Sequence, residues 1–190
     1  MTLVASQVRV PGTGELFVAD VGTEAPADTT TALDPAWTGL GYTNEDGVTL
    51  SRSLEREPVN AWQSLTPLRY IYNAATLGIS AAMLQSNAEV AGLWWGGGDF
   101  AETALDSGVF KADMPVIPEG TEKAVLLEFK DDDITARIWV AKMDLAETGD
   151  VTLNRQGATA FQLTFNALAP DSGTVMATWL TDDPAFGPPA

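Results

Sequence analysis

Carboxylates are the only abundant side chains in this sequence that could perform chemistry near neutral pH. The 190 residues include 26 Asp and Glu but no histidine and no cysteine. Without those two residue types the chain lacks imidazole bases and the usual ligands of zinc, haem, copper and iron–sulfur clusters. Disulfides are excluded as well. The remaining options are paired carboxylates, Ser–Lys pairs, and Mg²⁺ or Ca²⁺ held by oxygen atoms.

Two acidic clusters could gather oxygen ligands for a divalent cation. The first consists of Glu128, Asp131, Asp132 and Asp133, and the second of Asp144, Glu147 and Asp150. The first cluster does not match the spacing of an EF-hand and lacks the glycine that such a loop requires. A run of three aspartates between apolar stretches is more typical of a solvated turn. We interpret the second cluster in the same way.

Aromatic and glycine motifs offer two further kinds of chemistry. Trp94 and Trp95 stand close to Asp99 and Glu102, an arrangement that would suit a glycosidase. Any acidic β protein contains many such pairs, so packing of a short helix is the favoured interpretation. The run of glycines at 96–98 could cradle a phosphate, but no Lys-Ser or Lys-Thr follows it, and it indicates the end of a helix instead. No Ser precedes a Lys by three residues.

The charge balance constrains the partners of the chain. Ten Lys and Arg give a formal net charge of −16 and a pI near 4.1. No two basic residues are adjacent, so we expect repulsion from a phosphate backbone and no specific binding of nucleic acid. Acidity that serves only solubility is the alternative. The sequence shows no signal peptide and no apolar run long enough to span a membrane, so we expect no membrane anchor and a cytosolic site of synthesis.

The elements that would position these groups are mostly strands. We expect strands at 15–20, 37–42, 47–53, 68–72, 75–85, 123–130, 134–143, 161–167 and 175–180. Asp46-Gly47 predicts a hairpin turn, and Asp131 to Asp133 a second tight turn. One short helix is expected at 87–95, capped by Asn87 and ended by the glycines.

Short strands separated by turn signals predict a mainly β fold. We expect a single domain over residues 1–190: a β-sandwich or partial barrel of two packed antiparallel sheets, with one short flanking α-helix. Three segments should extend from it. They are an N-terminal arm at 1–14, a charged projecting loop at 54–63, and a flexible Pro-rich C-terminal arm at 182–190.

One segment resembles a known family. Residues 37–48 read W-x-x-L-G-Y-x-x-E-D-G-V, which is similar to a stretch of the major tail proteins of siphophages, the tail tube subunits of long non-contractile tails. The resemblance continues through residues 54–62, 136–142 and 160–168, and then through 170–173. It covers roughly residues 15–175, judged by the order of segments expected for a one-domain sandwich.

The resemblance implies a structural virion protein without catalytic residues, metal or cofactor. It implies a β-sandwich that assembles in the host cytoplasm as hexameric rings, which stack into a tail tube that conducts phage DNA. Besides copies of itself, the implied partners are the tape measure, tail tip and tail terminator proteins, with genomic DNA only in passage. The candidate contacts between subunits or rings are Arg52, Leu54, Glu55, Arg56, Glu57, Pro58 and Trp62. The candidate acids of an acidic lumen are Glu128, Asp131, Asp132 and Asp133.

Two other functions fit a β-sandwich of this composition. A monomeric carbohydrate-binding module would use Trp62, Trp94 or Trp95 as an exposed stacking platform. A related virion part, such as a tail terminator, would form a single ring and would not grow into a tube.

Overall fold

The computed structural model describes residues 4–155, 157–171, 173 and 175–187. The outermost residues of both expected arms, 1–3 and 188–190, and Ser172 of the 170–173 segment lie outside the described residues. The strands are β1 (Thr13–Asp20), β2 (Thr38–Gly39), β3 (Thr43–Ala61), β4 (Ser64–Met83), β5 (Ala101–Glu102), β6 (Phe110–Lys111), β7 (Glu122–Asp131), β8 (Ile134–Thr148), β9 (Phe161–Ala167) and β10 (Ala177–Thr181). The helices are α1 (Ala88–Trp95) and two 3₁₀ turns, η1 (Ala5–Gln7) and η2 (Pro184–Phe186).

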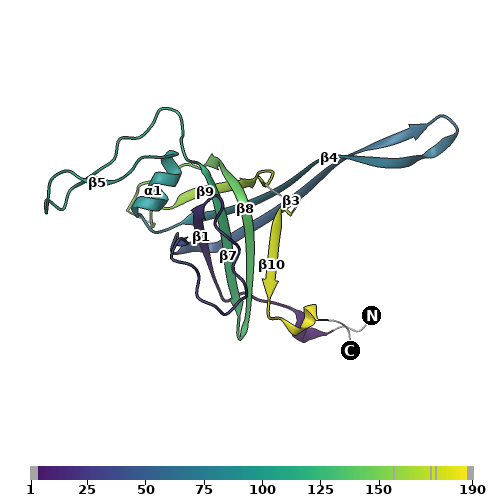
Figure 1. Ribbon diagram of the computed structural model, residues 1–190, viewed down its shortest axis with the longest axis horizontal. Helices are drawn as coiled ribbons and strands as arrows, with labels where there is room; N and C mark the ends of the chain where they lie inside the picture. The colour runs from purple at the N-terminus through teal and green to yellow at the C-terminus, as the bar shows by residue number, and fades with distance from the viewer. Residues whose placement is uncertain (1–3, 156, 172, 174, 188–190) are drawn as a thin grey trace.

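Eight of the described strands form one antiparallel sheet that is folded into two layers. The strand order is β2-β1-β7-β8-β9-β4-β3, and β10 also pairs with β8. The first part of β8 lies between β7 and β10, whereas its last residues pair with β9. Strand β8 therefore connects a layer of β2, β1, β7 and β10 to a layer of β9, β4 and β3, and the two layers cross in Figure 1. The barrel is not closed, and the fold is the expected mainly β sandwich.

The main core lies between these layers. Its fully buried side chains come from β1, β4, β7, β8 and β9, and from α1. They include Leu16, Val18, Ile79, Met83, Val90, Val125, Val140, Met143, Leu163 and Phe165. The alternation expected in 161–167 is confirmed in β9. Leu163 and Phe165 are buried, whereas Asn166, which points to the other face of the strand, is exposed.

The other face of β1 and β7 carries a smaller apolar cluster. Ala19 and Leu126 are buried there beneath the segment 21–37, whose Trp37 packs against them. Successive side chains of a strand point to opposite faces, so one pair of strands serves both the main core and this cluster. The loop expected at 22–35 is therefore a cover over the outer face of the sandwich.

Helix α1 begins and ends as expected. Asn87 caps it, since its side-chain oxygen accepts a hydrogen bond from the Val90 amide at 2.8 Å. Gly96 ends the helix in the left-handed region, with φ of 74°. A Cβ at Gly96 would lie 2.6 Å from the Cβ of Pro118, so this glycine also permits close packing of the returning chain.

Strands β3 and β4 differ most from the sequence-based expectation. The hairpin turn predicted at Asp46-Gly47 is wrong, because both residues lie inside β3. The pairing with β4 is irregular between Thr43 and Val48, and Gly47 adopts a φ of +69° there, as in a β-bulge.

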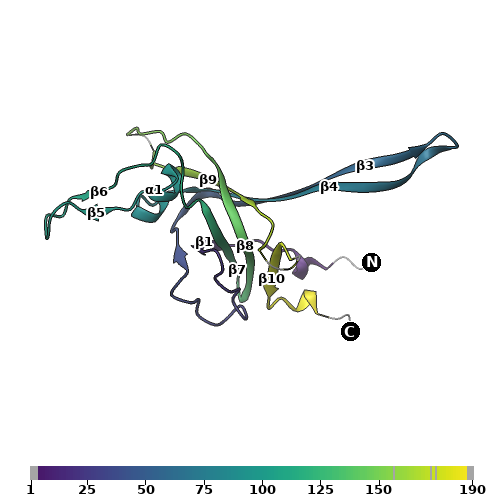
Figure 2. The same ribbon diagram turned by 45° about the horizontal axis from the view of Figure 1, so that its top comes forward.

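The segment expected as a projecting loop, residues 54–63, is also mostly strand. Strand β3 runs to Ala61 and β4 starts at Ser64, so only Trp62 and Gln63 form the turn. The strands expected at 47–53, 68–72 and 75–85 are parts of this one long hairpin. Pro58 is tolerated within β3 because β3 is the outermost strand of the sheet. The segment does project from the sandwich (Figures 1 and 2).

Candidate assembly surfaces

The distal parts of β3 and β4 form a two-stranded arm that leaves the sandwich. We call residues 52–76 the hairpin arm. Its base is the pair formed by Arg52 and Leu77, and Leu77 is the first buried residue of β4 after the turn. Beyond that point nearly every residue of both strands is exposed, on both faces of the ribbon. Figure 2 shows the arm extending well beyond the two layers.

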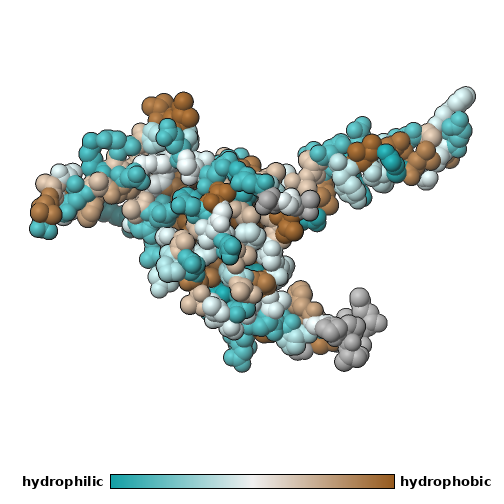
Figure 3. All heavy atoms as spheres, viewed as in Figure 1, coloured by the Kyte–Doolittle hydropathy of each residue, from teal (hydrophilic) through white to brown (hydrophobic). Residues whose placement is uncertain are grey.

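The hairpin arm exposes an unusual amount of apolar surface. Trp62 at its turn is 99% exposed, and the brown residues along the arm in Figure 3 continue this surface toward the sandwich. The other exposed apolar residues of the arm are Leu54, Leu65, Leu68, Tyr70, Ile71 and Tyr72. A two-stranded ribbon is marginally stable in water, and apolar surface of this extent on a projection is typical of a contact with another chain.

All seven contact residues expected from the sequence lie on the hairpin arm. Six belong to β3, and the seventh, Trp62, belongs to the turn. Only Arg56 is held by a partner within the described arm, with its guanidinium 4.6 Å above the ring of Tyr70. The apolar residues of β4 in the arm were missed, because residues 68–72 were interpreted as a separate strand. A signal that could have revealed them is the matched length of the two segments on either side of Trp62-Gln63, which have 19 and 20 residues.

The expected acidic turn is confirmed between β7 and β8. Asp132 has a φ of 51° there, in the left-handed region that a tight turn requires. Asp132 and Asp133 are exposed. Asp131 holds the N-terminal segment instead, because its carboxylate accepts a hydrogen bond from the Val10 amide at 3.2 Å.

Glu128, the fourth candidate acid of the lumen, is electrostatically different from the acids of the turn. Its carboxylate lies 2.7 Å from Arg137 Nε and 3.1 Å from Lys130 Nζ. Partial burial acts to raise the pKa of Glu128, but the hydrogen bonds from these two cations outweigh burial and lower it. The charge of Glu128 is therefore compensated within the monomer.

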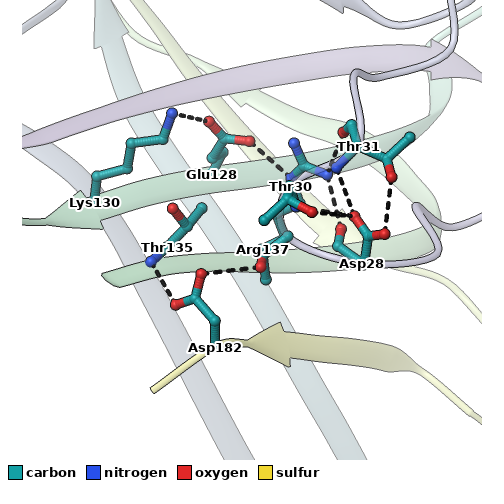
Figure 4. A network of polar contacts seen from close by, with 9 residues as sticks. Asp28, Thr30, Thr31, Glu128, Lys130, Thr135, Arg137 and Asp182 are labelled. Atoms are coloured by element: carbon teal, nitrogen blue, oxygen red, sulfur yellow. Dashed lines mark hydrogen bonds and ion pairs between the residues drawn. The ribbon is translucent and has the colours of Figure 1, made fainter. Parts of the chain in front are cut away.

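Arg137 organises a polar network that fastens the covering segment to the sandwich (Figure 4). Arg137 is 5% exposed, and besides Glu128 it donates to the carbonyls of Asp28 and Thr31 at 2.7 and 2.9 Å. The Asp28 carboxylate accepts hydrogen bonds from the backbone and hydroxyl of Thr31 and from the Thr30 amide. These bonds lower the pKa of Asp28 to about 2. Sequence patterning gave no signal for this role, because Arg137 is an isolated cation within a strand.

The three tryptophans considered for sugar binding do not form one surface. Trp62 lies at the tip of the arm, whereas Trp94 and Trp95 lie in α1 on the opposite side of the sandwich (Figure 1). The indole of Trp94 donates to the Gly149 carbonyl at 3.0 Å and meets Trp95 and Phe161 edge to face. Trp94 thus packs the helix onto the sheet, as expected.

The other candidate chemistries receive no support from the geometry. Glu102 lies in β5 and accepts a hydrogen bond from the Gly108 amide at 2.7 Å. In the described ranges, no group of three acidic side chains is placed to hold a metal ion. None of the helices in the described part of the chain is long and apolar enough to cross a membrane.

A sandwich with a projecting arm that exposes apolar side chains is typical of the class of proteins that contact other chains. The comparison with protein families is specific: residues 1–190, the whole chain, match the family of phage tail tube proteins, and the chain belongs to that family. It is therefore a structural component of a phage tail, which points to a non-enzymatic protein. A search of curated proteins finds no match.

Proposed function

We propose that this chain assembles as hexameric rings that stack into the tube of a long phage tail, through which the DNA passes. The family supports self-assembly into a tail tube. The observation that carries the proposal is the hairpin arm, which has both faces exposed and its apolar residues outside any core. Such an arm gains stability when a neighbouring subunit covers it.

Ring closure would use the free edges of the folded sheet. Strand β3 is the last in the strand order, so one of its edges has no partner strand within the described residues. Unpaired edges are sites of aggregation unless a specific partner covers them. Pairing between neighbouring subunits around a ring would remove the edges and close a larger barrel.

Stacking of rings would use the hairpin arm. The arm extends along the longest dimension of the subunit (Figure 1), so it can reach a subunit of the adjacent ring. Its three arginines and two glutamates can set the register of this contact by charge complementarity.

DNA passage would use the acidity of the chain. Six copies with a net charge of −16 each would carry a formal −96 per ring. Only acids within a Debye length of the DNA, about 8 to 10 Å, can act on it. Asp132 and Asp133 are exposed at one end of the β7–β8 pair and are the better lumen candidates, since Glu128 is already paired with cations and Asp131 holds the Val10 amide.

The proposal includes the usual setting of a tail tube. Assembly takes place in the host cytoplasm, around a tape measure protein, between a tail tip and a tail terminator. DNA passes without specific binding. The competing form of assembly is a single ring that does not stack. Tubes seen by microscopy would distinguish stacked rings from single rings.

The decisive experiment removes the arm without disturbing its base. Ser53 pairs with Thr76, so replacing residues 54–75 by Asn-Gly gives a short hairpin with the same register. The core residues from Leu77 to Met83 are retained. We expect a folded monomer that forms no tubes in negative-stain microscopy at concentrations where the intact chain does. Tubes formed by the shortened protein would overturn the role of the arm in stacking.

The lumen is tested separately in the assembled tube. We expect a reconstruction of the tube to show carboxylates, including those of the β7–β8 turn, facing the bore. A neutral or basic bore would contradict the proposed mode of DNA passage and would leave the role of the arm intact.

A further inference from the structure

A second projection leaves the sandwich on the side opposite the hairpin arm. It is formed by residues 99–120, which we call the β5–β6 loop, and Figures 1 and 2 show it extending away from α1. The loop has a defined shape. Its two short strands pair, the Thr103 amide donates to the Val109 carbonyl at 2.9 Å, and the Glu119 amide donates to the Gly96 carbonyl at 2.7 Å.

The β5–β6 loop carries apolar side chains that have no core to enter. Val116 is 101% exposed, and the other exposed apolar residues of the loop are Phe100, Leu105, Val109, Phe110 and Ile117. Figure 3 shows brown residues gathered at the extremities of this side of the molecule, far from those on the hairpin arm. The described subunit therefore has two apolar projections at opposite ends of its longest dimension.

The two projections also differ in charge. The hairpin arm has three arginines, Arg52, Arg56 and Arg69, against two glutamates, and so carries a formal +1 in a chain of net −16. The β5–β6 loop has five carboxylates against Lys111 alone, a formal −4. Electrostatic attraction between the two surfaces is the reverse of the general repulsion between copies of an acidic chain.

The arginines of the arm lack carboxylate partners within the described residues. Six of the ten cations of the chain form ion pairs within the described residues, and all six lie outside the arm. Across the described part of the chain, no carboxylate pairs with Arg52, Arg56 or Arg69. The loop offers matching acids, since Asp99 and Glu119 are exposed carboxylates without an ion pair among the described residues.

We infer that the hairpin arm of one subunit docks onto the β5–β6 loop of a second copy of this chain. The inference rests on the proposed function and names the surface that receives the arm. Because the two surfaces lie at opposite ends of one molecule, the arm cannot contact the β5–β6 loop of its own subunit. The contact between two copies is therefore head to tail. A head-to-tail contact either closes a ring or propagates along an axis, and propagation is what a stack of rings requires.

A competing receiver is a groove on the sandwich with a volume of about 520 Å³. Leu127, Phe129, Ile138 and Trp179 give it an apolar lining, but among the described residues only Glu45 adds a charge to it. The charge of the arm therefore favours the β5–β6 loop over the groove.

The test is a charge swap between the two surfaces. One variant carries Arg52→Glu, Arg56→Glu and Arg69→Glu, and a second carries Asp99→Lys, Asp113→Lys and Glu119→Lys, all at exposed positions. We expect each variant alone to raise the critical concentration for tube formation at least about tenfold. Combining all six substitutions should restore it to within about threefold of the unmodified chain, since reversed pairs attract again. Matched controls are Arg155→Glu and Asp150→Lys, exposed charges outside both surfaces.

Each outcome has a distinct meaning once circular dichroism and thermal melting show that the variant monomers are folded. Normal assembly of the loop variant overturns the inference. So does a combined variant that stays as defective as its parents. If the loop substitutions leave assembly unchanged but Trp179→Glu abolishes it, the arm binds the groove instead of the loop. If the unmodified chain forms neither tubes nor rings, the proposed function itself fails.

Discussion

Arg9 and Asp183 lie 174 residues apart in the chain and meet in a two-point ion pair. Arg9 Nε donates to one carboxylate oxygen of Asp183 at 2.6 Å, and Nη2 donates to the other at 2.7 Å. The Asp183 carboxylate is buried and also caps η2 by accepting from the Ala185 amide at 2.8 Å. Hydrogen bonds from Arg9 and from that amide hold the pKa of Asp183 below its ordinary value. The two terminal segments are thereby joined beside the β7–β8 turn, where Gly12 donates to the Lys130 carbonyl.

Breaking this pair should release both terminal segments together. In Asp183→Asn one charge is lost and the two-point geometry with the guanidinium is weakened. We expect amide protection of Val10, Gly12 and Ala185 in hydrogen exchange to fall about tenfold, with the core amides unchanged. Asp113→Asn, which breaks the exposed pair with Lys111, is the matched control and should change nothing at these sites. Unequal loss at the two ends would show that the segments are held independently.

The stability of the covering segment should depend on pH through Asp28. Its pKa is about 2 in the folded protein, below its ordinary value of 3.8, so its carboxylate stabilises the fold above pH 4. That contribution is lost as the pH falls from about 4 to about 2. We expect Asp28→Asn to be less stable than the unmodified chain at pH 6, and we expect most of this difference to be lost at pH 2, by denaturant unfolding at both values. A difference that is as large at pH 2 as at pH 6 would mean that the carboxylate charge is not the cause.

Removing Arg137 should be costly because it leaves several groups without partners. Arg137→Met would leave the half-buried Glu128 without its main partner, as well as the carbonyls of Asp28 and Thr31. We expect a loss of about 3 kcal/mol in the free energy of unfolding, measured by urea titration. Arg137→Lys should recover only part of it, because an ammonium group cannot reach three acceptors in the fixed geometry of a guanidinium. An Arg137→Lys protein as stable as the unmodified chain would show that the geometry of the guanidinium is irrelevant here.

Trp62 should matter for assembly and not for folding. Its side chain is 99% exposed, so we expect Trp62→Ser to change the free energy of unfolding by less than about 0.5 kcal/mol. The same substitution should raise the critical concentration for tubes, measured by sedimentation. Trp37→Ala is the contrasting variant, since Trp37 is buried under the covering segment and its loss should cost about 3 to 5 kcal/mol. An unchanged critical concentration in Trp62→Ser would exclude the arm tip from the contact.

Gly96 should resist substitution for two separable reasons. A side chain there is strained by the φ of +74°, and its Cβ would also approach Pro118 to 2.6 Å. We expect Gly96→Ala to cost more than the roughly 1 to 3 kcal/mol of backbone strain alone. Gly108→Ala isolates the strain, because its φ is +65° but no atom lies within 4 Å of the added Cβ. Equal losses in the two variants, by thermal unfolding, would mean that the contact with Pro118 relaxes freely.

Local signals were enough to predict several elements of the fold. Asn87 and Gly96 mark the ends of α1 because capping depends only on residues next to the helix. The alternation of Leu163 and Phe165 with polar neighbours predicts a strand with one buried face. The turn at Asp132 follows from aspartates between two apolar runs. In each case the determining contacts lie within a few residues of one another.

The hairpin arm could only be recognised in part. Its charged residues and Pro58 indicated a segment that leaves the sandwich, but they concealed the continuous pairing of β3 with β4. A ribbon exposed on both faces has no buried side, so it shows no alternation of apolar and polar residues. Asp46-Gly47 resembled a turn because a glycine with positive φ serves a hairpin turn and a β-bulge alike.

By itself the sequence determined the exclusion of imidazole and thiol chemistry, the acidity, the mainly β class and the capped helix, because composition and local periodicity suffice for these. It also carried the motif of residues 37–48 that resembles tail tube subunits, a family to which the whole chain belongs. Only the tertiary structure decided that β8 joins two layers, that Arg137 fastens the segment 21–37, and that the hairpin arm and the β5–β6 loop project from opposite ends. Those relationships depend on contacts between residues far apart in the chain, and pairing at long range leaves no trace in local spacing.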